Sequence, residues 1–224
     1  MLNRLNLFFG VFFFLISLVF YFNPSLDIDI TRIFYNDVEG FFLAHNPFVI
    51  FIFKAVPIIT LIYGITLLIW TILLVRKKNN VKQAMLNIAI LASLIIGSGI
   101  LVNMGLKENF GRARPKQIKE FGAKKEFSKV YEVADQCSRN CSFASGHAAA
   151  AYAATTVAFL VPPNLQIATY LGGIFYGTLV GLGRIIQGGH FISDVASSAW
   201  IVLIVNYLVI SLCLYIFRSK RFDS

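Results

Sequence analysis

The chain has 224 residues, of which 57% are hydrophobic and only 14% are charged. Soluble domains are about 45–50% apolar and about 25% charged, so this composition excludes an ordinary soluble domain, and its apolar content also excludes a disordered chain. The net charge is +9, and the charged residues lie between apolar runs. This pattern indicates a lipid surface or a phosphorylated substrate as the partner, and not nucleic acid.

Six apolar segments are predicted to cross a membrane as helices, because each approaches the roughly 20 residues that a bilayer requires. The first, 5–22, has no charge and no small-residue cleavage site after it, so it is predicted to be a retained span and not a signal peptide. We therefore expect one all-α domain over 1–224, a six-helix bundle whose outer catalytic loop is 105–144. The remaining predicted spans are 55–75, 84–104, 145–161, 166–186 and 194–217.

Basic residues in the short loops predict that both chain ends face the cytoplasm. The polar segment 105–141 also holds nine Lys and Arg residues, which disagrees with this rule, but six spans with both ends inside place it on the outer side. Segment 23–47 could form an interfacial helix near the outer face, and no role is predicted for its residues. The cations that set the orientation are Arg76, Lys77, Lys78, Lys82, Arg218, Lys220 and Arg221.

Cys137 and Cys141 lie four residues apart in the outer segment. Because a disulfide persists in an oxidising compartment such as the periplasm, this location favours a disulfide between them. Two free thiols, or half of a metal site, are the alternatives, and a lone pair of cysteines at this spacing is weak evidence for a metal.

The first polar motif starts where the third span ends. Lys107, Arg112 and Arg114 put three cations within eight residues, followed by a proline. Arginine presents a planar fork that matches phosphate oxygens, and lysine adds a point charge. The alternative is that these side chains only anchor a helix end at the membrane surface.

The second motif, Ser145-Gly146-His147, opens the fourth span. The first turn of a helix has free backbone N–H groups and the positive end of the helix dipole, which together favour an anion. Gly146 would let a ligand approach the backbone closely. Ser145 could instead serve only as a helix cap.

The third motif joins the fifth and sixth spans through Arg184, His190 and Asp194. His190 and Asp194 are four residues apart, so they share one face if the helix already begins at His190 and can then form a hydrogen bond. A carboxylate on one ring nitrogen leaves the other nitrogen free to attack. The alternative is a structural His–Asp contact at a helix start.

In order and spacing, these three motifs resemble the signature of the type 2 phosphatidic acid phosphatase superfamily. Two departures are Ala144, where the family often has proline, and Gly183, where it often has serine. The resemblance implies that His190 attacks phosphorus to form a phosphohistidine, that Asp194 orients His190, and that His147 protonates the leaving oxygen. It further implies no metal, no other cofactor and no required protein partner, with Arg112 at most secondary. The implied phosphate-binding residues are Lys107, Arg114, Ser145, Gly146 and Arg184.

Within that superfamily, the residues around the two cysteines and His190 are similar to bacterial inner-membrane lipid A phosphatases, which remove the 1- or 4′-phosphate at the periplasmic face. The lysines of 116–129 would suit a headgroup with several phosphates, although the interspersed acids equally suit a solvated loop. An undecaprenyl pyrophosphate or phosphatidylglycerophosphate phosphatase, or a phosphotransferase, would use the same motifs. An anion transporter is disfavoured because no span has a charge near its centre.

Overall fold

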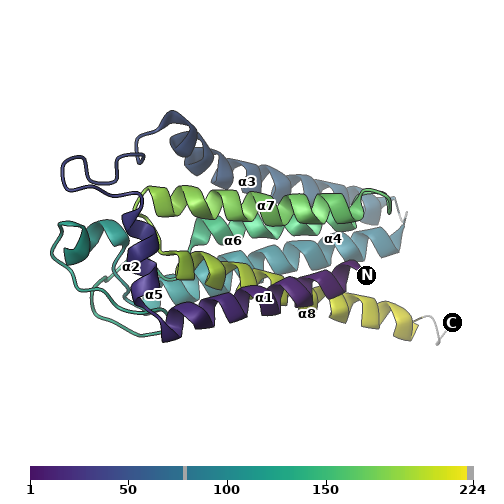
Figure 1. The fold of residues 1–224 in the computed structure, drawn as a ribbon. Coiled ribbons are helices and arrows are strands. Elements are labelled where there is room, and N and C mark those ends of the chain that lie inside the picture. The colour runs from purple at the N-terminus through teal and green to yellow at the C-terminus, as the bar shows by residue number, and fades with distance from the viewer. Residues whose placement is uncertain (78–79, 221–224) are drawn as a thin grey trace.

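The computed structural model describes residues 1–77 and 80–220, and it is an all-α bundle (Figure 1). Lys78 and Arg221, two of the cations used for the orientation, lie outside the described residues. The helices are α1 (Leu2–Phe22), α2 (Ser25–Arg32), α3 (Pro47–Arg76), α4 (Val81–Ser93), the π-helical η1 (Leu94–Leu106), α5 (Lys107–Asn109), the short η2 (Pro115–Gln117) and η3 (Lys119–Phe121), α6 (Gly146–Tyr152), the 3₁₀ helix η4 (Ala153–Phe159), α7 (Gln166–Ile186) and α8 (Ile192–Lys220).

Four helices of the described chain are long and apolar enough to cross a membrane: Leu2–Phe22, Pro47–Arg76, Val81–Asn109 and Ile192–Ile216. They contain four of the predicted spans, but their ends differ. The second helix begins at Pro47 and not at residue 55, because the helix continues through the charged Lys54 to a cap where the Asn46 side chain accepts from the Phe48 N–H (2.9 Å).

The other two predicted spans correspond to shorter or less apolar helices. Segment 145–161 forms α6 followed by η4, each seven residues long, and segment 166–186 forms α7 with 21 residues. Neither is among the four long apolar helices. The all-α prediction is therefore confirmed. Of the six predicted spans, four correspond to helices that are long and apolar enough to cross a membrane.

Small residues bring α7 against the central α6–η4 segment. A Cβ atom at Gly173 would lie 2.8 Å from the Thr155 backbone, and one at Gly177 would overlap the buried Tyr152 ring. One turn further along, a Cβ at Gly181 would overlap Val195 of α8. Glycine is needed at these positions because a side chain would hold the helices apart.

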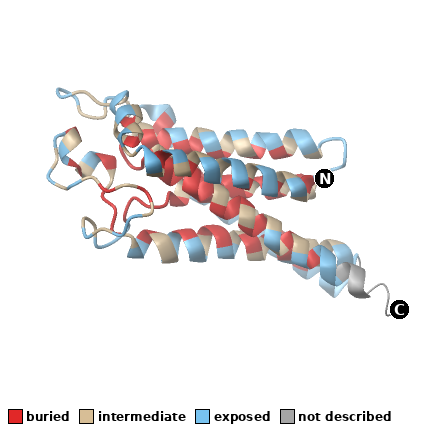
Figure 2. Ribbon diagram, turned by 60° about the horizontal axis from the view of Figure 1, so that its bottom comes forward, coloured by how far each residue is buried: buried red, intermediate tan, exposed pale blue. Residues whose placement is uncertain are grey.

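The outer faces of the long helices carry exposed apolar side chains, such as Phe8 on α1 and Phe51, Ile58 and Leu61 on α3. Figure 2 shows the exposed residues along these outer faces and the buried residues where the helices converge. Exposed apolar surface of this extent is typical of a lipid-facing bundle, not of a soluble protein.

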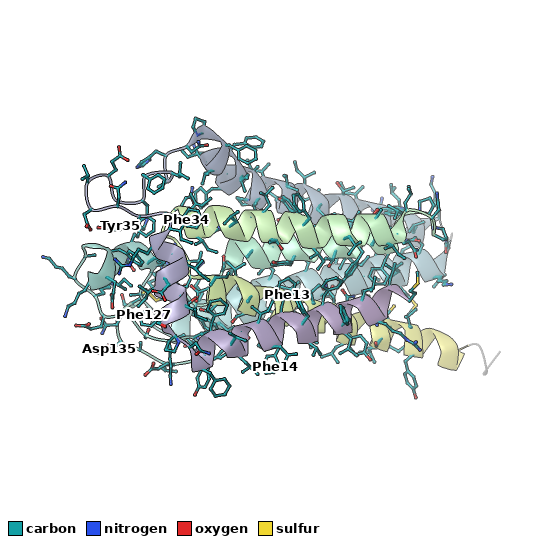
Figure 3. All side chains as sticks on the ribbon, in the orientation of Figure 1. Phe13, Phe14, Phe34, Tyr35, Phe127 and Asp135 are labelled. Carbon is teal, nitrogen blue, oxygen red and sulfur yellow. A yellow bond between two sulfur atoms is a disulfide. The ribbon has the colours of Figure 1, made fainter. Side chains whose placement is uncertain are left out.

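The bundle has two distinct ends (Figure 1). The start of α1, the end of α3, the start of α4 and the end of α8 lie at one end, and α2, α5 and the polar segment after it lie at the other. Figure 3 shows the side chains at this second end, where Tyr35, Phe127 and Asp135 are labelled. All three sequence motifs meet near this end, away from the chain termini.

Candidate active site

The first two motifs are held together by backbone hydrogen bonds. The Cys141 N–H donates to the Lys107 carbonyl (3.2 Å), and the Ser142 N–H donates to the Arg112 carbonyl (2.9 Å). A disulfide joins Cys137 and Cys141 in the structure. These contacts bring the polar segment back over the end of η1, so that the start of α6 lies beside the cations of the first motif.

His190 lies in the linker between α7 and α8 and is fully buried. Its Nδ1 is 2.7 Å from the Ser142 carbonyl oxygen. Because a carbonyl only accepts, Nδ1 carries the hydrogen and Nε2 keeps its lone pair. Nε2 is buried and has no hydrogen-bond partner among the described residues. A buried, neutral imidazole with a free Nε2 is the form that a nucleophile requires.

Asp194 does not form the direct hydrogen bond to His190 that the sequence suggested. Helix α8 begins at Ile192, so His190 precedes it, and Asp194 Oδ2 lies 3.6 Å from His190 Nδ1 while the Ser142 carbonyl takes the hydrogen bond. The Asp194 carboxylate instead accepts from the Ser142 hydroxyl (2.6 Å) and the Phe191 N–H (2.9 Å). Asp194 therefore acts on His190 through its charge, and Ser142, which no motif singled out, sets the tautomer.

Arg112 has a larger structural role than the sequence indicated. Its side chain is 1% exposed, and its guanidinium donates to Asp194 (2.6 Å) and to Asp27 of α2 (2.8 Å). It also donates to the Ser193 hydroxyl (2.9 Å) and the Ser128 carbonyl (2.8 Å). The prediction of at most a secondary role concerned phosphate binding, and the guanidinium is instead paired with two buried carboxylates.

Three cations of the motifs gather near His190. Lys107 and Arg184 are buried and Arg114 is half-buried, and all three lie close enough to interact electrostatically. Arg184 donates from Nη1 to Gln187, and its Nε is buried with no partner among the described residues. An unpartnered guanidinium N–H and an unpartnered imidazole nitrogen in one cationic site would suit a phosphoryl group.

Arg114 is held by the loop that the disulfide closes. Its guanidinium donates to the Asn140 carbonyl (2.8 Å) and to the Asn140 side-chain oxygen (3.0 Å). Of the predicted basic run, Lys116 lies near Arg114 and Arg184, and burial and their charges lower its pKa. Lys119 instead pairs with Glu126.

The Ser-Gly-His motif occupies the first turn of α6. Ser145 caps the helix, its hydroxyl accepting from the Ala148 N–H (3.5 Å), and a Cβ at Gly146 would overlap Asn103. The His147 ring stacks on Phe53 of α3, with ring centres 4.6 Å apart. Phe53 was not predicted, and the Arg184 guanidinium lies 4.6 Å from the centre of the same ring. Phe53 thus connects the second and third motifs.

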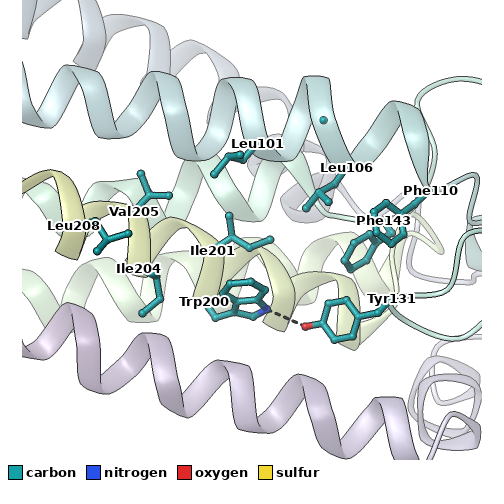
Figure 4. Close-up of a pocket in the computed structure, with 11 residues that line it drawn as sticks. Leu101, Leu106, Phe110, Tyr131, Phe143, Trp200, Ile201, Ile204, Val205 and Leu208 are labelled. Atoms are coloured by element: carbon teal, nitrogen blue, oxygen red, sulfur yellow. Dashed lines mark hydrogen bonds between the residues drawn. The ribbon is translucent and has the colours of Figure 1, made fainter.

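Two cavities in the described part of the bundle differ in the chemistry of their walls. A cavity of about 380 Å³ is lined by Lys107, Gly146 and His147 together with apolar residues of α3. A larger cavity of about 530 Å³, between η1 and α8, is lined by apolar side chains together with Tyr131 and Trp200 (Figure 4). Of these two, only the first combines a cation and an imidazole with an apolar wall, as a phosphorylated lipid would require.

The state of His190 predicts a pH dependence of stability. Burial lowers the pKa of His190 to about 3, against 6.5 for the free side chain. Between these values the unfolded chain binds a proton that the folded protein does not, so stability falls as pH falls below about 6.5. We expect the free energy of unfolding to drop by about 2 kcal/mol more in the wild type than in His190→Gln between pH 7 and pH 5.

Denaturant unfolding of the detergent-solubilised protein at both pH values would measure this difference. Equal pH dependence in the wild type and His190→Gln would contradict it.

Comparison with known proteins places the whole arrangement in one family. The model of the PAP2 superfamily matches residues 86–218. A protein named Lipid A 4′-phosphatase, from Francisella tularensis subsp. novicida (strain U112), is 30% identical over 220 residues, covering 96% of this chain and 94% of the relative. Proteins of the same name from Rhizobium leguminosarum and Rhizobium etli are 30% and 36% identical, covering 72% and 52% of this chain and 67% and 45% of their own lengths.

No solved structure matches the chain. The family match covers more than half of the described sequence and includes all three motifs, from Lys107 to Asp194. The prediction drawn from the motifs is confirmed: the chain belongs to the PAP2 superfamily and is a phosphatase of that family.

Proposed function

We propose that this phosphatase removes the 4′-phosphate of lipid A by way of a phosphohistidine on His190. The observation that carries the proposal is the free, buried Nε2 of His190 beside the Lys107, Arg114 and Arg184 cations. The choice of lipid is supported by the relatives, three of which are named Lipid A 4′-phosphatase. Lys116 beside the phosphate-binding arginines suits a headgroup with a second phosphate.

In the first step, His190 Nε2 attacks phosphorus and the bond from phosphorus to the lipid oxygen breaks. The bonding electrons go to that oxygen, which takes a proton from His147. Lys107, Arg114 and Arg184 bind the nonbridging phosphoryl oxygens, with the Ser145 hydroxyl and the Gly146 N–H at the start of α6.

In the second step, water attacks the phosphohistidine and gives its proton to His147. The P–N bond breaks, its electrons return to Nε2, and inorganic phosphate leaves. During the intermediate, Nδ1 keeps its hydrogen, so the phosphorylated ring is cationic, and the Asp194 charge 3.6 Å away stabilises it.

We further propose six transmembrane segments within a single domain of the bacterial inner membrane, with both termini cytoplasmic and the active site facing the periplasm. The arrangement of the bundle supports this: α1 starts and α8 ends at one end, and the site lies near the other (Figure 1). The Cys137–Cys141 disulfide at the site end fits an oxidising compartment.

Mass spectrometry of total lipids, including lipid A, tests the substrate. Bacteria would express the wild type, His190→Ala or no protein. We expect lipid A to lose one phosphate only with the wild type, and fragmentation to place the loss at the 4′ position.

Other results would overturn parts of the proposal. Loss of the 1-phosphate would reject the position, and loss of phosphate from undecaprenyl or glycerophospholipids alone would reject lipid A. An active His190→Ala protein would reject the phosphohistidine.

A further inference from the structure

Asp27 is a buried carboxylate in α2, within segment 23–47, for which no role is predicted from the sequence. It is 0% exposed, and α2 brings it to the start of α8. Its oxygens accept from Arg112 Nη2 (2.8 Å), the Ser193 N–H (3.1 Å) and the Ser193 hydroxyl (2.5 Å). Burying a carboxylate away from water is unfavourable unless a charged partner compensates for the lost hydration. The charged partner of Asp27 is Arg112, which also binds Asp194.

Arg112 is shared between the two carboxylates. One end of its guanidinium binds Asp194 and the other binds Asp27, while the Phe191 ring centre lies 4.3 Å from its Cζ. Burial raises the pKa of Asp27, and the Arg112 charge opposes that shift. Both Asp27 oxygens accept hydrogen bonds, and the N–H donors on them can only donate, which fits the ionised form.

The charges of Asp27, Arg112 and Asp194 set the net charge that faces His190. Asp27, Arg112 and Asp194 together carry one net negative charge. Without Asp27, Arg112 and Asp194 would neutralise each other, and His190 would face no net charge from the cluster. With Asp27 present, the Arg112 charge is balanced, and a negative charge remains on the Asp194 side, 3.6 Å from His190 Nδ1.

We propose that Asp27 is a positioning residue of this active site: by balancing and holding Arg112, it leaves the Asp194 charge free to stabilise His190 when His190 carries the phosphoryl group. The proposal rests on the phosphohistidine mechanism given above. It extends the site from the three motifs to α2, and it gives the segment before the second span a function in the chemical step.

The first test replaces Asp27 with asparagine and with glutamate, with Asp29→Asn as the matched control. Asp29 lies on the same helix but is exposed. We expect Asp27→Asn to lower kcat by about 10- to 100-fold with KM changed less than about threefold, the scale seen when a partner behind a reacting group is removed. Asp27→Glu should recover part of kcat, and Asp29→Asn should match the wild type.

Rates are compared per mole of the monodisperse protein collected by size-exclusion chromatography, so that misfolded protein does not lower the measured kcat. A purely structural role would change the yield of monodisperse protein and leave its kcat unchanged. A kcat of Asp27→Asn within about twofold of the wild type, or a loss that appears only in KM, would overturn the proposal.

A double variant keeps the proposal testable if Asp27→Asn does not fold. Arg112→Met alone leaves two buried negative charges, whereas Arg112→Met with Asp27→Asn restores the single net charge of the wild type. We expect the double variant to have a kcat at least about fivefold above that of Arg112→Met. A double variant no more active than Arg112→Met would overturn charge balancing.

His190→Ala in the same assay tests the phosphohistidine mechanism separately from the role of Asp27. If His190→Ala is inactive and Asp27→Asn is fully active, the proposed mechanism stands and the role of Asp27 falls. If His190→Ala is active, the mechanism itself falls, and the role of Asp27 falls with it.

Discussion

Replacing His190 with alanine is expected to lower phosphate release from a lipid phosphomonoester by about 10⁴-fold or more. Alanine removes the Nε2 atom that is proposed to form the bond to phosphorus, and no other described histidine is placed to replace it, because His147 is stacked on Phe53 at the start of α6. The cations would still bind substrate, so the loss should appear in kcat. Release of inorganic phosphate by purified protein in detergent measures it.

The control is His45→Ala, which removes an exposed histidine of the segment before α3. It should retain wild-type activity. An alkaline quench of the wild type with radiolabelled substrate should trap label on the protein, and His190→Ala should trap none. Substantial activity in His190→Ala, or labelling of that variant, would contradict His190 as the nucleophile.

Replacing Asp194 with asparagine is expected to lower kcat by about 10³-fold. The lost negative charge faces the imidazole that would become cationic in the proposed intermediate, and a comparable Asp→Asn change behind the histidine of serine proteases costs about 10⁴-fold. The loss of hydrogen bonds adds to the effect. Asp194 accepts from three donors, on Arg112, Ser142 and Phe191, so an asparagine NH₂ would point at one of them.

Steady-state kinetics of the monodisperse protein measures this prediction, with Asp135→Asn as the control. Asp135 is an exposed carboxylate at the same end of the molecule (Figure 3). We expect KM to change little, because the proposed phosphate-binding residues Lys107, Arg114 and Arg184 are unchanged in this variant. A kcat of Asp194→Asn within tenfold of the wild type would contradict an electrostatic role for Asp194.

The amino-acid sequence by itself determined the class of protein and the chemistry of its motifs. Apolar runs near the length of a bilayer identify spanning helices without any tertiary information, and four of the six predicted spans are long apolar helices in the structure. The three motifs identified the PAP2 superfamily, because their residue types and internal spacings are fixed locally along the chain.

Helix ends were less predictable, since the ends depend on caps and not on hydropathy. α3 extends past Lys54 to the Asn46 cap, and the third span extends through η1 to Asn109. The central α6–η4 segment changes from an α-helix to a 3₁₀ helix after Tyr152, and hydropathy does not encode that change.

Only the tertiary structure decided how His190 is held. The Ser142 carbonyl takes the Nδ1 hydrogen bond, Arg112 joins Asp194 to Asp27, and Phe53 stacks on His147. Each of these pairs joins residues 48 to 94 positions apart. No local spacing encodes such contacts, because they depend on how the helices pack and on which buried charges must then be paired.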